Sequence, residues 1–152
     1  MALRRRAAYF KYAGTSSQVQ FGMAIKRTWI RLGTTTIDLD PVVKIVFDRA
    51  DARMFVSAGE ALLMAAWTKE RADITKLKEF ASPDNGWIDG KSDALDNSAV
   101  NERIKLSSID KVVLVETSLG SVVELFARGV FLGQVAGPDA IAAVEQRLGI
   151  TQ

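Results

Sequence analysis

Asp38 and Asp40 are the first side chains along the chain whose spacing could support chemistry, because they alternate on a predicted strand. Alternation places both carboxylates on one face of the strand, roughly 7 Å apart. That separation suits a pair of acid and base groups, or a bound cation. A solvated outer face opposite Ile37 and Leu39 explains the same pattern. We favour this second interpretation.

A second set of carboxylates lies in a polar segment after the middle of the chain. These are Asp84, Asp89, Asp93 and Asp96. The run from Asn85 to Ile88 resembles the centre of an EF-hand calcium loop, with Gly86 at the invariant glycine. That alignment puts Ala81 and Pro83 where the first two carboxylates belong, and Ser92 where the bidentate glutamate belongs. We therefore expect no metal ion, although an irregular calcium site stays an alternative.

Nucleophilic catalysis has little support in the residues. Ser108 and Lys111 have the Ser-x-x-Lys spacing, but that chemistry needs both on one helical turn, and Lys111 opens a predicted strand. The chain has no cysteine and no histidine, which removes thiolate chemistry and the commonest general base. It also has no phosphate-loop or dinucleotide glycine pattern. We expect a protein that is not an enzyme and binds no cofactor.

Charge is distributed unevenly along the chain. Residues 1–37 carry seven basic side chains and no acid, whereas residues 38–152 carry thirteen basic and eighteen acidic ones. Such asymmetry favours an anionic partner for the basic end. No apolar run approaches the roughly 18 residues of a membrane-spanning helix, so we expect no membrane span.

The basic end contains the candidate interaction residues. Residues 1–14 are predicted to form an arm in which arginines precede aromatic side chains, and Arg27, Trp29 and Arg31 then share one face of an alternating strand. Arginines beside an aromatic ring can bind a phosphate backbone and stack a base, or can cover a sheet face. The candidates are Arg4, Arg5, Arg6, Tyr9, Phe10, Lys11, Tyr12, Arg27, Trp29 and Arg31.

Periodicity predicts an α+β fold. We expect a β-rich body of about six to eight short, mostly antiparallel strands, a central helix at about 57–80 and a C-terminal helix at about 138–148. Ser57 and Glu60 have capping-box spacing at the start of the first helix. Pro138 and Gly149 mark the ends of the second. The predicted organisation is a basic arm at 1–14 and a single α+β domain at 15–152, with a long acidic loop at 81–103.

The stretch from Ile104 to Leu148 combines several meandering strands with one closing helix. In this order of elements it resembles the closing half of a pleckstrin-homology-type domain. The resemblance implies a binding module for an anionic lipid head group or a peptide, which would use basic residues within 1–31.

A basic arm with aromatic anchors and an acidic loop on a β-rich body together favour contact between subunits. Arms and loops that interlock around small β-domains are typical of bacteriophage and other viral structural proteins. We therefore expect a self-assembling structural protein, such as a virion capsid or tail component, that binds itself and other structural proteins. It would be located in the virion if viral, and otherwise in the cytoplasm. The alternatives are the lipid or peptide module and, third, a nucleic-acid-binding protein.

Overall fold

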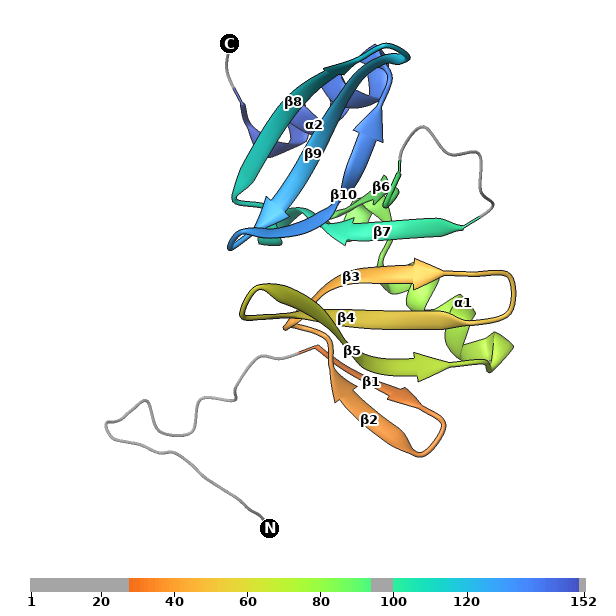
Figure 1. Cartoon of the computed structure of the whole chain (residues 1–152). Helices are drawn as coiled ribbons and strands as arrows, with labels where there is room; N and C mark the ends of the chain where they lie inside the picture. Colours follow the sequence, from red (N-terminus) through yellow and green to blue (C-terminus); the bar gives the residue numbers. More distant parts are fainter. Residues whose placement is uncertain (1–27, 94–99, 151–152) are drawn as a thin grey trace.

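The computed structural model describes residues 28–93 and 100–150 (Figure 1). Within these residues the chain forms ten strands in three antiparallel sheets and two α-helices, which confirms the predicted α+β, β-rich class. The elements are β1 (Trp29–Leu32), β2 (Thr35–Asp38), β3 (Val42–Phe47), β4 (Ala52–Ala58), β5 (Ala61–Thr68), α1 (Arg71–Phe80), β6 (Trp87–Gly90), β7 (Asn101–Lys105), β8 (Lys111–Thr117), β9 (Gly120–Ala127), β10 (Val130–Ala136) and α2 (Pro138–Leu148).

The largest sheet, called here the large sheet, has the strand order β5-β4-β3-β7-β6. Strand β7 lies between β3 and β6, so Ile104 is opposite Lys44 on one side and opposite Ile88 on the other. Ile104 is fully buried. The strand that follows β6 in the chain thus lies between β3 and β6, with the buried Ile104 paired to both neighbours.

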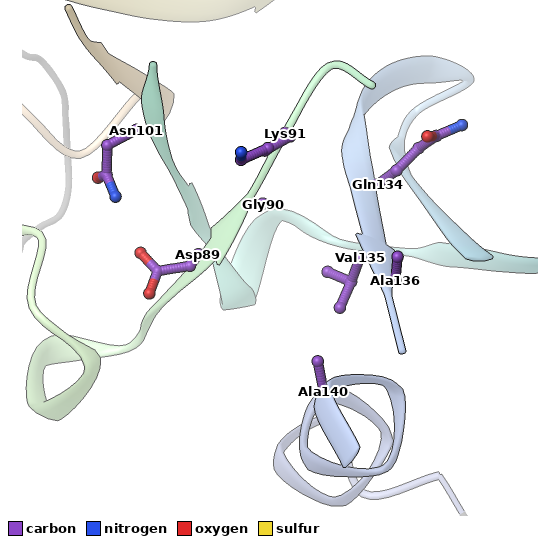
Figure 2. A pocket seen from close by; sticks show the side chains of 8 residues that line it. All are labelled: Asp89, Gly90, Lys91, Asn101, Gln134, Val135, Ala136 and Ala140. Carbon is purple, nitrogen blue, oxygen red and sulfur yellow. The ribbon is translucent and has the colours of Figure 1, made fainter. Parts of the chain in front are cut away.

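The small sheet, with the order β10-β9-β8, meets the large sheet where β6 ends. Lys91 N donates to Gln134 O (3.0 Å), and Gln134 N donates to Lys91 O (2.6 Å). Figure 2 shows this end of β6 running beside β10. Gly90 and Gly133 make the approach possible, because a Cβ at either position would lie 2.7 or 2.9 Å from Ile104 Cδ1.

Two clusters of buried side chains fill the interior. The first lies between the large sheet, the β1–β2 hairpin and α1, with Met54 and Leu77 fully buried in it. The second joins the two sheets to α2 through Ile104, Leu125 and Val144. Figure 1 shows α1 behind the large sheet and α2 behind the small one.

Arg147 connects α2 to the start of β6. Its Nη1 donates to Trp87 O (2.8 Å), and its Nη2 donates to Pro83 O (2.6 Å). Trp87 belongs to the first buried cluster, whereas α2 covers the second. A single side chain therefore ties the two parts of the interior together.

The central helix is shorter than predicted, because residues 57–68 form the end of β4, a turn and β5. Ser57 pairs with Leu62 across a tight turn at Gly59, whose φ of +61° reverses the chain. The capping-box spacing of Ser57 and Glu60 is therefore coincidental. Alanine, leucine and methionine favour helices, but pairing with β4 decides the outcome in this segment. Only the C-terminal half of the predicted range is helical, and α1 begins at Arg71.

The predicted loop at 81–103 is also largely ordered secondary structure in its described part. A 3₁₀ turn at Pro83–Asn85 leads into β6, and β7 begins at Asn101. Strand β6 is short and contains Asp89 and Gly90, which are rare in strands, so its sequence resembles a turn. Hydrogen bonding to β7 makes this segment a strand, although its composition does not favour one.

The last third of the chain agrees closely with prediction. Strands β8, β9 and β10 form a meander of two hairpins, and α2 follows with Pro138 at its first turn. Gly149 adopts the left-handed conformation (φ +74°) and ends the helix, as its position predicts. None of the helices in the described residues is long and apolar enough to cross a membrane.

The packing around Ile104 predicts a measurable coupling. Gly90→Ala should lower the free energy of unfolding by about 1–3 kcal/mol, because the new methyl overlaps Ile104 Cδ1. Ile104→Val alone should cost about 0.5–1.5 kcal/mol through the lost methyl. The double variant should be less destabilised than the sum of the two, since the overlapping atom is gone. Urea unfolding of the four proteins tests this, and strict additivity would contradict the packing described.

Candidate interaction surface

Strand β5 forms one outer edge of the large sheet. It pairs with β4 along its whole length, and no other described strand pairs with it. Its sequence, Ala-Leu-Leu-Met-Ala-Ala-Trp-Thr, contains no charged residue and no proline. Natural edge strands usually carry lysine, proline or an inward-pointing charge to prevent pairing with other chains. Apart from a bulge between Met64 and Ala66, β5 has none of these protections.

Large apolar side chains on β5 are exposed. Leu63, Met64 and Trp67 retain 55%, 56% and 49% of their accessible surface. Thr68 is the one buried residue of the strand. Met64 and Trp67 lie opposite Phe55 and Arg53 on one face of the strand, and Leu63 lies opposite Val56 on the other face. Large apolar side chains exposed on both faces of an open strand commonly mark an interaction site. We call Ala61–Thr68 the β5 edge.

Trp67 is held in its exposed position by polar contacts at one end of its ring. Its Nε1 donates to Asp51 Oδ2 (3.1 Å), and Asp51 is paired in turn with Arg53 (3.4 Å). The Lys69 ammonium lies 5.1 Å from the ring centroid. An exposed tryptophan whose indole N–H is already hydrogen-bonded is a typical anchor of protein interfaces.

Beside the β5 edge, the open face of the large sheet contains a hollow of about 380 Å³ lined by Val46, Phe55 and Leu62. A buried ion pair forms part of its wall: Lys44 Nζ lies 2.7 Å from Glu102 Oε1. Ser92 Oγ donates to the same carboxylate at 3.1 Å. Both charged side chains are more than nine-tenths buried. Each charge has therefore lost most of its hydration and is stabilised by the opposite charge of its partner.

A second hollow, of about 580 Å³, lies between Trp87, Phe80 and Lys105. The Lys105 ammonium donates to Asp40 O (2.6 Å) and to Leu39 O (3.1 Å). Burial lowers the pKa of Lys105 below its ordinary value, although the charges of Asp40 and Asp38 oppose this effect. Backbone carbonyls use two of its three donors, so the lysine joins β7 to the turn before β3.

The hollow in Figure 2, of about 300 Å³, lies at the junction of the sheets and extends to Ala140 on α2. Its carboxylate, Asp89, is paired with Arg103 at 2.8 Å. Its walls also include the polar residues Lys91, Asn101 and Gln134, besides small residues such as Gly90 and Ala136. Within residues 28–93 and 100–150, no three carboxylates gather as a metal site would require.

The structure places two of the candidate interaction residues from the sequence. Trp29 is 58% exposed, and Arg31 is exposed beside it, while Ile30 and Leu32 between and after them are buried. The predicted alternation of this strand is therefore confirmed. The other candidates, Arg4, Arg5, Arg6, Tyr9, Phe10, Lys11, Tyr12 and Arg27, lie outside the described residues.

The β5 edge was missed by sequence reasoning, because its residues were assigned to a helix. One signal was available: eight uncharged residues between Glu60 and Lys69, directly after a glycine that can reverse the chain. An amphipathic helix would show polar residues at helical spacing within such a run, and this run has none before Thr68.

Comparison of the chain with protein-family models, with curated proteins and with solved structures finds no match. Inferences about its function therefore come from its own residues.

The buried ion pair yields a stability prediction. Lys44→Met should lower the free energy of unfolding by about 3–5 kcal/mol, because it leaves the Glu102 carboxylate buried without its cation. Adding Glu102→Leu should restore most of the loss, since two apolar side chains of similar volume then replace both charges. Urea midpoints of the wild type and the two variants provide the measurement. A double variant as unstable as the single one would show that the charges themselves hold the strands together.

Proposed function

We propose that this protein is a self-assembling structural subunit whose copies meet through the β5 edge. The observation that carries the proposal is an open, uncharged strand that exposes Leu63, Met64 and Trp67. An exposed strand offers unpaired backbone donors and acceptors to another chain, and its side chains supply apolar area to the same contact.

The charges at the ends of the β5 edge favour a second copy of this chain as the occupant. Glu60 precedes the strand and Lys69 follows it, and both are exposed. Two copies of β5 in antiparallel contact bring the Glu60 end of each strand to the Lys69 end of the other. Opposite charges then meet at both ends of an isologous contact. A parallel arrangement would place like charges together.

The free energies of burial and association indicate a weak contact, whose occupancy depends on protein concentration. Burying the exposed half of a Leu, Met or Trp side chain contributes about 1 kcal/mol, so six such side chains, three per copy, contribute about 6 kcal/mol. Association costs about 4–15 kcal/mol in lost translational and rotational freedom. The side chains alone therefore match only the lower end of that cost. Backbone hydrogen bonds between the strands must therefore supply much of the net affinity.

A subunit with interfaces and without a centre for chemistry suits a virion shell or tail, which is the location that the sequence analysis favours. The basic segment at 1–31 would then serve contacts with other structural proteins or with nucleic acid. Both assignments stay predictions. A virion preparation that contains the protein at many copies per particle would support them.

Two tryptophans of similar exposure provide a matched test. Trp67→Lys should reduce the mass of the assembled protein at every concentration and raise the apparent dissociation constant at least tenfold, about 1.4 kcal/mol, because a charge enters the apolar strand. Trp29→Lys, on β1, should assemble like the wild type. Light scattering over a dilution series provides the measurement.

Either of two results would overturn the proposal: a wild-type protein that is monomeric at all concentrations, or a Trp67→Lys variant that assembles normally. If Trp29→Lys loses assembly and Trp67→Lys does not, the interface lies on β1, which carries Trp29 and Arg31. Circular dichroism of each variant confirms that it is folded before its mass is interpreted.

A further inference from the structure

Strand β8 forms the outer edge of the small sheet. It pairs with β9 from Lys111 to Thr117, and no other described strand pairs with it. Figure 1 shows β8 in the upper sheet and β5 in the lower one, so the two open strands belong to different parts of the molecule.

The composition of β8 is unusual for a solvated edge. Its sequence is Lys-Val-Val-Leu-Val-Glu-Thr, and none of its residues is buried, although four of them in a row are valine or leucine. Leu114, at the centre, is 59% exposed. Consecutive β-branched and aliphatic residues on an open strand form a surface that pairs readily with another strand.

Charges again stand at both ends of the apolar run. Lys111 opens the strand, with its ammonium 4.5 Å from the Phe126 ring centroid, and Glu116 follows Val115. Glu116 Oε1 accepts a hydrogen bond from Ser121 Oγ (2.6 Å). Local contacts thus hold both charged side chains near the ends of the strand.

We infer that β8 is a second interface of the same kind, occupied by β8 of another copy in antiparallel contact. This inference rests on the proposed function, because it extends self-assembly from one edge to two. Antiparallel contact brings the Lys111 end of each strand to the Glu116 end of the other. The strand is thereby complementary in charge to itself.

Pairing of β5 with β8 fits the charges less well. An antiparallel contact between them would bring Glu60 to the Glu116 end and Lys69 to the Lys111 end. In a parallel contact opposite charges would meet, but the spacings differ. The positions of Glu60 and Lys69 are nine residues apart, and those of Lys111 and Glu116 are five apart. At about 3.3 Å per residue that difference is about 13 Å, so both charge pairs cannot form together.

Two isologous interfaces on different edges have a defined consequence. Each copy joins one neighbour through β5 and another through β8, so contacts alternate along a row of subunits. Such a row either continues as a filament or closes into a ring with an even number of copies. One isologous interface alone would stop at a dimer.

The test uses four full-length proteins: wild type, Trp67→Lys, Leu114→Lys and the double variant. The wild type should form species larger than a dimer. Each single variant should stop at a mass of two subunits, because one edge remains, and the double variant should be monomeric. Leu119→Lys is the matched control. It adds the same charge at an exposed leucine in the adjacent turn, outside β8, and should assemble like the wild type.

The outcomes separate the two proposals. If Leu114→Lys assembles like the wild type while Trp67→Lys does not, the β8 interface is refuted and the β5 edge stands. If Trp67→Lys assembles like the wild type, the proposed function fails. If both single variants are monomeric but form a dimer when mixed, the contact joins β5 to β8 and the isologous arrangement is refuted. Urea midpoints confirm that every variant is folded.

Discussion

The close approach of two backbones at Lys91 and Gln134 is the contact on which the rest of the structure depends. It requires glycine at positions 90 and 133, since Ile104 fills the space between them. Through it the large and small sheets share one buried cluster that α2 covers. Without this contact, the small sheet with α2 and the large sheet with α1 would each have to form a separate hydrophobic core. Units of this size are rarely stable alone.

The same junction determines which strands remain at the outside. Strands β6 and β10 meet each other, so β5 and β8 are left as the outer strands of the large and small sheets. Closure into a barrel would have removed these edges. Both strands instead carry uncharged apolar runs with opposite charges at their ends. Open edges of this composition are hazards in a monomer and are well suited to a subunit of an assembly.

Local signals made part of this fold predictable. Strands β8 to β10 follow one another through short turns, and α2 is bounded by Pro138 and Gly149. Strand β6 was not predicted because it has four residues and contains Asp89 and Gly90, which are rare in strands. Strand β5 was not predicted because its residues favour helix in isolation. Missing β5 meant missing the candidate surface. The stripe at Trp29 and Arg31 was found, because alternation in one strand requires no knowledge of its neighbours.

Arg147 has a consequence for the order of events during synthesis. Its guanidinium group holds the carbonyls of Trp87 and Pro83, and it lies on α2, which leaves the ribosome after every strand described here. Until α2 emerges, the second buried cluster has no cover and β6 lacks this clamp. Strand β5, in contrast, precedes β6 to β10 in the chain, and its Leu63, Met64 and Trp67 are exposed even in the complete fold. During synthesis β5 therefore leaves the ribosome before the elements that complete the second buried cluster.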